Sequence, residues 1–284
     1  MVTIEDYVKA KLSDIRRFSQ QDFSWDNYRA IPKSRQPFGF QVFLQTQEIP
    51  KRLHRDWIIE QFGNRENYYN GFVAAMLWGG INANRPVKGQ AGNLETTNFY
   101  KAFSVPKEKI TENLEQTKIW IAKDKIHELH AEYENGKFKI PGVGESFFTK
   151  LLFFAGMNTE NPIKPLIYDK WTKIMHIWIL LSQNDREKID NYFSLKEINK
   201  KLISVRRPDL LYTNSEKVSA SYVDYVRQMN RIADTHSLNV SNLEGYLFGI
   251  AMRGQANNDP LLNPRVFMVE QIKKGWIQKG FSKY

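Results

Sequence analysis

The stretch KFKIPGVGESFFTKLLFFAGMNTENPIKPLIYDKWTKIMH (137–176) decides how the chain folds. Its turn IPGVG (140–144) is followed by an apolar run from about Glu145 to Gly156, which predicts a helix buried nearly all round. A loop over 157–165 comes next, and Asp169 then stands directly before a second apolar helix. The segment therefore predicts two buried helices, one begun by a glycine-rich turn and the other by an aspartate.

The glycine-rich turn offers a place for an anion. Gly142 and Gly144 carry no Cβ, so the backbone adopts unusual angles there and approaches a ligand closely. Their N–H groups lie at the start of a helix, where a DNA phosphate is favoured and no base sequence is read. A simple tight turn explains the same residues, and by themselves they favour that simpler interpretation.

Two polar residues stand out in the apolar segments. Lys150 interrupts the first helix: either its stem snorkels and its amine reaches water, or the amine faces a cleft and becomes a better nucleophile through partial desolvation. Asp169 is sufficiently explained as the N-cap of the second helix. It also suits a carboxylate held at the mouth of a cleft, because a capping bond fixes the direction of the side chain.

The rest of the chain predicts a mainly α fold. Alternating residues indicate at most a small β element near 38–45, and residues 82–98 are polar enough for a surface loop. We expect a single module over 1–284, with the hairpin and the functional segment within 126–180. Apolar residues at helical spacing predict further helices over Thr3–Ser19, 65–79, Lys107–Tyr133, 186–203, 216–236, 241–253 and 264–279.

Composition narrows the function. The chain has 41 Lys and Arg against 31 Asp and Glu, and the net charge of +10 indicates a polyanionic partner, nucleic acid before a membrane surface. It has no cysteine, which excludes disulfides, thiol nucleophiles and iron–sulfur clusters. Its longest apolar stretches reach about half of the roughly 20 residues that span a bilayer. We expect a cytoplasmic protein without a signal peptide.

Histidine spacing gives no sign of a metal. His127 and His130 in HELH lack the HExxH spacing and an evident third ligand, so we expect no metal site and no cofactor.

The order of helix, IPGVG turn, helix, loop, apolar triplet and aspartate resembles the helix-hairpin-helix DNA glycosylases. More narrowly, SFFTKLLFFAG (146–156) followed by PLIYDKW (165–171) is similar to their bacterial branch with the 8-oxoguanine-glycosylase fold. MLWGG (76–80) and NLEGYLFGIA (242–251) resemble helices of that branch. The resemblance implies a two-lobed fold that flips a modified base out of double-stranded DNA and cleaves its N-glycosidic bond.

In that superfamily an aspartate assists loss of the base, and in lyase-competent members a lysine attacks the sugar C1′. The resemblance thus implies that Asp169 is the catalytic aspartate and Lys150 the candidate nucleophile. Eukaryotic 8-oxoguanine glycosylases have the lysine directly after the hairpin, where this chain has Ser146. Lys150 lies one turn later, which resembles archaeal members. We expect DNA contacts from the hairpin residues Gly142, Val143, Gly144 and Ser146.

A flipped base needs a pocket with aromatic walls and polar edges. Sequence proximity makes Trp78, Asn82, Tyr168 and Trp171 the candidates, with Gln255 as a further amide. Each of these side chains is also a plausible core or surface residue. Cations that could hold the DNA backbone, although such clusters are by default solvated, are Arg206-Arg207, Lys273-Lys274 and Lys279.

Three functions stay open at this point. The first two are excision of oxidised guanine in repair and excision of a phage's hypermodified cytosine in antiviral defence, to which we lean slightly. The third is a non-catalytic DNA-binding module in which Asp169 is only a cap. We expect a monomer, and the sequence leaves open whether Lys150 forms a Schiff base.

Overall fold

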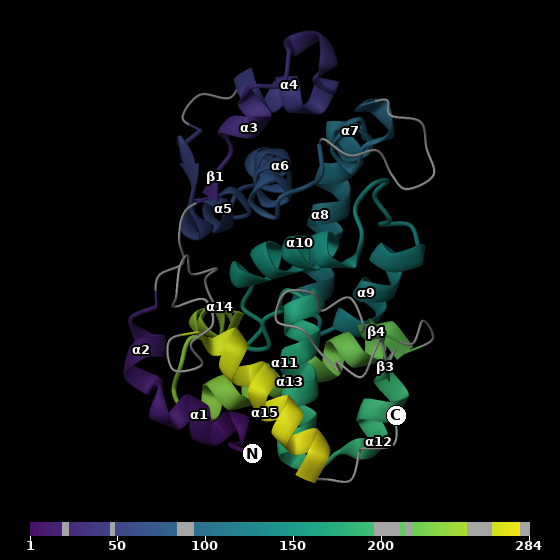
Figure 1. The fold of residues 1–284 in the computed structure, drawn as a ribbon. Coiled ribbons are helices and arrows are strands. Elements are labelled where there is room, and N and C mark those ends of the chain that lie inside the picture. Colours follow the sequence, from purple (N-terminus) through teal and green to yellow (C-terminus); the bar gives the residue numbers. More distant parts are fainter. Residues whose placement is uncertain are drawn as a thin grey trace. The chain divides into compact units, whose positions relative to one another are not determined.

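The computed structural model describes residues 1–18, 23–45, 49–83, 94–195, 211–213, 217–248 and 263–278. This part of the chain is mainly helical with two small antiparallel sheets, which confirms the expected fold class (Figure 1). The chain forms two compact units, and each is described by itself. Unit 1 combines Met1–Gln20 with Tyr168–Tyr284, and unit 2 is Gln21–Ile167.

Unit 2 consists of helices and one short antiparallel pair of strands. Strands β1 (Phe23–Ser24) and β2 (Arg52–Leu53) pair antiparallel, and 3₁₀ turns cover Lys33–Arg35, Arg65–Asn67 and Leu94–Thr96. Its helices are α3 (Asp26–Arg29), α4 (Phe38–Gln45), α5 (Arg55–Gln61), α6 (Tyr68–Trp78), α7 (Asn98–Phe103), α8 (Lys107–Ala122), α9 (Ile126–Asn135) and α10 (Glu145–Met157).

Helices α6 and α10 form the centre of unit 2. Both are apolar nearly all round, and every residue over Phe72–Leu77 and Phe148–Gly156 is buried. Helix α10 packs against α5, α6, α8 and α9. Phe154 stacks on Phe62 with ring centroids 6.2 Å apart and meets Trp78 edge-on at 5.5 Å. The turn that precedes α10 is therefore attached to a helix that is buried in the core of the unit.

Unit 1 is built around α11, whose residues from Ile174 to Leu181 are all buried. Helix α11 packs along α15 and also contacts α1, α12 and α14 (Figure 1). Its helices are α1 (Ile4–Ala10), α2 (Leu12–Arg16), α11 (Lys170–Gln183), α12 (Arg186–Tyr192), α13 (Val218–Thr235), α14 (Val240–Phe248) and α15 (Pro264–Gln278). Strand β3 (Phe193–Leu195) pairs antiparallel with β4 (Leu211–Thr213).

The prediction of a strand near 38–45 is wrong, because these residues form helix α4. Phe40 and Phe43 lie three residues apart on one helical face and are fully buried. Phe40 meets Phe99 edge-on at 5.1 Å, and Phe43 meets Trp25 edge-on at 5.7 Å. Over a few residues an aromatic-rich run fits both the helical and the strand period. Here the tertiary packing of Phe40 and Phe43 favours the helix.

Two expected long helices are each divided. The helix expected over Lys107–Tyr133 is broken between α8 and α9, where Asp124 has a left-handed φ of 53° that no helix continues through. The helix expected over Thr3–Ser19 is interrupted at Lys11. Near 186–203, helix α12 ends at Tyr192 and strand β3 follows.

Some expectations lie outside the described residues. They are the segments 196–203 and 249–253, most of the loop 82–98, and the side chains of Arg206, Arg207, Gln255 and Lys279.

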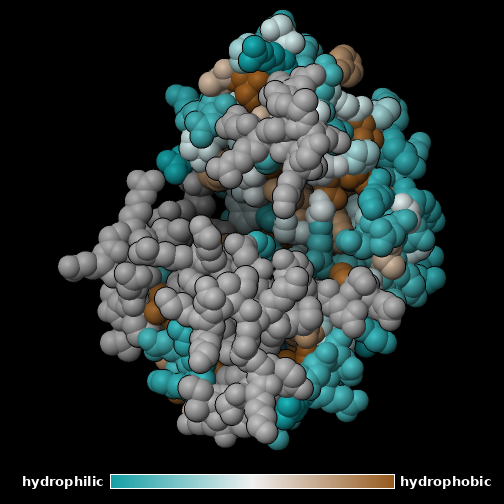
Figure 2. All heavy atoms as spheres, turned by 45° about the vertical axis from the view of Figure 1, so that its right-hand side comes forward, coloured by the Kyte–Doolittle hydropathy of each residue, from teal (hydrophilic) through white to brown (hydrophobic). Residues whose placement is uncertain are grey.

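No helix in the described part of the chain is long and apolar enough to cross a membrane. On the face shown in Figure 2 the described surface is mainly hydrophilic, with small hydrophobic patches between the polar side chains.

Candidate functional site

The turn between α9 and α10 is anchored by two apolar side chains. Ile140 and Val143 are buried, and the N–H of Val143 donates to the carbonyl of Ile140 at 3.1 Å, which closes the turn. Pro141 and Gly144 between and after them are exposed. The side chain of Val143 thus holds the turn to the core, and the neighbouring backbone faces outward.

The two glycines of this turn differ in what the fold demands of them. Gly142 has a left-handed φ of 78°, and a Cβ there would lie 2.6 Å from the carbonyl oxygen of Asn98. Gly144 has an extended backbone that any residue adopts, and a Cβ there would meet nothing within 4 Å. Gly144 is also the N-cap of α10 and provides no side-chain cap. The fold requires a glycine at 142 but leaves open space at 144.

His130 connects the two helices across the turn. Its fully buried Nε2 lies 3.3 Å from a carboxylate oxygen of Glu145, the first residue of α10, and its ring meets Phe148 edge-on at 4.9 Å. His130, one of the two histidines considered as metal ligands from the sequence, thus contacts Glu145 and Phe148 of α10. Within the described residues, no group of three side chains suited to a metal ion lies together.

Lys150 lies on α10 with only 8 % of its surface exposed. Its Nζ donates to the carbonyl of Ser146 one turn earlier and lies 5.0 Å from the centroid of the Phe147 ring. Its stem passes so close to Gly79 that a Cβ there would lie 2.9 Å from Cδ of the lysine. This environment favours the partly desolvated amine over a lysine that extends into water.

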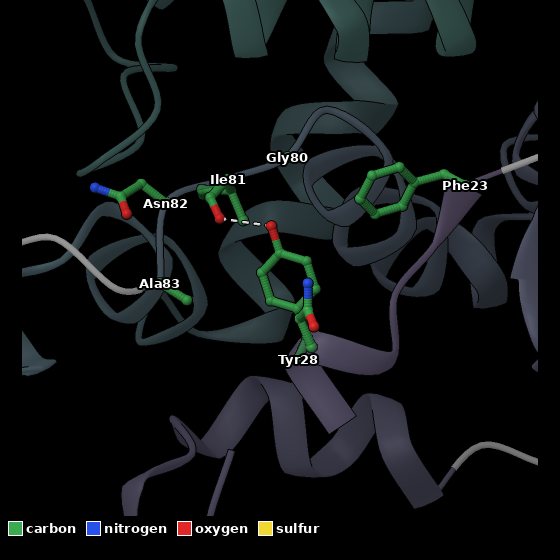
Figure 3. A pocket seen from close by; sticks show the side chains of 7 residues that line it. Phe23, Tyr28, Gly80, Ile81, Asn82 and Ala83 are labelled. Carbon is green, nitrogen blue, oxygen red and sulfur yellow. Dashed lines mark hydrogen bonds between the residues drawn. The ribbon is translucent and has the colours of Figure 1, made fainter. Parts of the chain in front are cut away.

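A pocket of about 440 Å³ lies in unit 2 beyond the end of α6. It is lined by Phe23, Asn27, Tyr28 and the segment 80–83, which includes Asn82. Figure 3 shows the Tyr28 hydroxyl pointing at the carbonyl of Ile81, to which it donates at 2.7 Å. This bond braces one wall of the pocket, whose volume is in the range of small-molecule sites.

Asp169 caps α11, as the sequence predicted. Its Oδ1 accepts from the N–H of Trp171 at 2.8 Å and of Thr172 at 3.1 Å. The N–H of Asp169 in turn donates to the Thr172 hydroxyl at 2.7 Å, which completes a capping box. Among the described residues, Oδ2 accepts none of these bonds. The carboxylate is therefore fixed through one oxygen and presents the other.

A buried polar network holds the residue before Asp169. The hydroxyl of Tyr168 lies 2.6 Å from the Ser221 hydroxyl and 3.1 Å from Nδ1 of His176. Nε2 of His176 lies 3.0 Å from Asp224, which also accepts from Lys188 at 2.9 Å. Burial lowers the pKa of His176, although Asp224 partly opposes the shift. The imidazole is therefore neutral inside the fold.

The four base-pocket candidates have different surroundings. Tyr168 is fully buried within the network above, and Trp78 packs edge-on against Phe154. Trp171 is half-buried, with the Arg265 guanidinium 4.6 Å from its ring centroid. Lys150 and Asn82 belong to unit 2, and Asp169, Tyr168 and Trp171 belong to unit 1.

A protein-family model matches most of the chain. The model of a family described as "Putative 8-oxoguanine DNA glycosylase OGG-like protein" matches residues 16–248, which include the turn, Lys150 and Asp169. The chain belongs to this family. No curated protein and no solved structure matches it. Family membership supports a DNA glycosylase role in general and DNA as the substrate polymer.

Several polar residues of this glycosylase-family chain were not anticipated from its sequence. Arg265 beside Trp171, Asp224 beside His176 and Tyr28 in the pocket come from segments far away along the chain. Arg265 is one of 41 Lys and Arg residues, and its neighbours in NPRVF (263–267) give no signal that distinguishes it from the others.

We expect the two glycines of the turn to respond oppositely to substitution. Gly142→Ala should cost about 2 kcal/mol of unfolding free energy, because it combines a left-handed backbone with a clash. Gly144→Asn should change stability by less than about 0.5 kcal/mol, because asparagine is a good N-cap. Gly144→Asn should instead weaken binding to all DNA sequences alike. Urea unfolding and fluorescence-anisotropy titrations check both, and unchanged DNA binding by Gly144→Asn would contradict the phosphate role.

The buried His176 should make stability depend on pH. Unfolded histidine takes up a proton near pH 6.5, whereas the folded imidazole stays neutral to lower pH. Protons therefore favour unfolding, so this contribution is fully present above about pH 6.5 and is lost as the pH falls toward the lowered folded pKa.

Urea unfolding at several pH values measures this effect. His176→Gln should flatten the dependence between about pH 6.5 and 5, and the exposed His127→Gln is the matched control that should leave it unchanged. Equal slopes in wild type and His176→Gln would show that His176 does not titrate as inferred.

Proposed function

We propose that the chain is a DNA glycosylase that flips a modified base out of double-stranded DNA and cleaves its N-glycosidic bond, leaving an abasic site. The observation that carries the proposal is the carboxylate of Asp169, held through Oδ1 by the N–H groups of Trp171 and Thr172. A carboxylate oriented before the substrate arrives costs no reorganisation during the reaction.

Cleavage of an N-glycosidic bond builds positive charge on the sugar. The transition state resembles an oxocarbenium ion, which a nearby carboxylate stabilises as it does in glycosidases. The base leaves with the electron pair of the bond and takes up a proton. In this mechanism Asp169 provides the negative charge, and the capping bonds on Oδ1 direct Oδ2 toward the sugar.

Lys150 is the proposed nucleophile. Its amine lies at a largely buried position of α10, 5.0 Å from the centroid of the Phe147 ring, and the neutral form of an amine attacks carbon. Attack of Nζ on C1′ with departure of the base gives an aminal that opens to a Schiff base. A Schiff base permits subsequent strand cleavage. The proposed lyase activity therefore requires Lys150 to act as the nucleophile.

The remaining parts fit DNA binding. The exposed backbone at Gly144 and the first turn of α10 suit a phosphate, with the side chain of Val143 anchoring the turn. The pocket lined by Asn82 offers an amide and aromatic edges of the kind that a base needs. The family match favours oxidised guanine as the first substrate to test, and a phage's hypermodified cytosine in antiviral defence is the second. We propose that a cytoplasmic monomer performs the reaction.

The test of Asp169 is a substitution that keeps its cap and removes its charge. Asn caps a helix as well as Asp does, so Asp169→Asn should fold normally and bind DNA. Its base release should fall at least about 10²-fold, the usual cost of losing one transition-state contact. The assay measures alkali-labile sites and released base in duplexes with 8-oxoguanine or glucosylated hydroxymethylcytosine.

Asp169→Ala is the matched control for the structural role. It loses the cap as well as the charge, so its unfolding free energy should fall by about 1 kcal/mol where that of Asp169→Asn does not. Base release by Asp169→Asn at the wild-type rate would remove Asp169 from the mechanism.

Borohydride reduction tests Lys150. A reduced covalent adduct should form between wild-type protein and substrate DNA, and peptide mapping should place it on Lys150. Lys150→Gln should give no adduct, whereas Lys139→Gln, an exposed lysine beside the same turn, should trap DNA as the wild type does. An active protein that gives no adduct would be a monofunctional glycosylase, and the nucleophile role would be wrong.

A further inference from the structure

Arg265 in the first turn of α15 lies against two aromatic side chains. Its guanidinium carbon lies 4.6 Å from the ring centroid of Trp171 on α11 and 4.3 Å from that of Phe248 on α14. Its Nε also donates to the carbonyl of Phe248. Three helices of unit 1 thus hold one planar cation, which limits its motion and fixes the direction of its remaining donors.

The described residues use only part of the hydrogen-bonding capacity of Arg265. A guanidinium carries five N–H donors, and only the Nε donor is engaged by the described residues. Among those residues its two Nη groups donate no hydrogen bond and form no ion pair. An arginine stacked on aromatic rings keeps its in-plane donors for a partner at its edge.

The charge of Arg265 acts near Asp169. Burial lowers the pKa of the guanidinium to about 10, and the carboxylate of Asp169 partly opposes that shift, so the arginine is a cation at neutral pH. Within the described residues the two do not form a direct ion pair. Asp169 alone would repel a DNA phosphate, and a fixed cation beside it offsets that repulsion.

We propose that Arg265 is a phosphate-binding residue that grips, through its two Nη groups, the DNA backbone next to the nucleotide processed at Asp169. This inference rests on the proposed function and extends it to a second contact with the DNA. The paired N–H groups of a guanidinium match two phosphate oxygens, which a lysine ammonium does not. Lys273 and Lys274 on the same helix are exposed and make no comparable stack among the described contacts.

The salt dependence of DNA binding tests the proposal. Each phosphate contact adds about 0.9 to the slope of log K against log salt concentration, because binding releases counterions. Arg265→Met keeps an apolar stem against Trp171 and removes the charge, so its slope should be smaller by about 0.9 for every DNA sequence alike. Fluorescence-anisotropy titrations at several salt concentrations measure the slope.

Lys9→Met is the matched control. It removes one exposed positive charge from α1, another helix of unit 1, at a residue to which no DNA contact is assigned. Its slope should equal that of the wild type. A wild-type slope for Arg265→Met, with wild-type DNA binding and base release intact, would overturn the inference and leave the proposed function standing. A wild type that neither binds DNA nor releases a base would overturn the proposed function itself.

A second variant guards against a folding defect. Arg265→Lys keeps the charge and loses the paired donors, so it should keep the wild-type slope and bind DNA more weakly. Thermal unfolding shows whether either variant is folded. If Arg265→Met does not fold, Arg265→Lys decides: weaker binding supports the bidentate contact, and wild-type affinity overturns it.

Discussion

The capping box at Asp169 begins α11, the helix on which the packing of unit 1 depends. Oδ1 accepts from two N–H groups of the first turn, and Thr172 returns a bond to the backbone of Asp169. Helix α11 is buried along most of its length and contacts α1, α12, α14 and α15. The bonds that start this helix also orient the carboxylate. The hydrogen bonds that stabilise the start of α11 thus also position the carboxylate of Asp169.

Polar side chains buried inside α10 and α11 have hydrogen-bond partners. Lys150 on α10 donates to a carbonyl of its own helix, and His176 on α11 lies between Tyr168 and Asp224. Buried polar groups are costly unless they are hydrogen-bonded, so such positions have either a structural or a chemical reason. His176 has a structural one, since its network holds Tyr168 directly before Asp169. Lys150 is 8 % exposed, and its hydrogen bond to the Ser146 carbonyl and its contact with the Phe147 ring satisfy its amine within α10.

Local signals in the sequence predicted what depends on local chemistry. The cap at Asp169, the start of α10 after Gly144 and the apolar character of both helices follow from residues a few positions apart. The strand near 38–45 was wrong because Phe40 and Phe43 fit a helix or a strand until their long-range partners are known. The break at Asp124 and the stack of Arg265 on Trp171 likewise depend on tertiary contacts that no short pattern encodes. Placing Lys150 and Asp169 in the mechanism required the family resemblance, because each has an adequate structural explanation by itself.

The most direct test of the central claim is mass spectrometry of the free bases that the wild-type protein releases from duplexes carrying different modified bases. We expect one modified base to appear in solution, with an equal amount of abasic site in the DNA. A protein that binds the same duplexes and releases none of these bases would be a DNA-binding module, and the account of Asp169 as a catalytic carboxylate would be wrong.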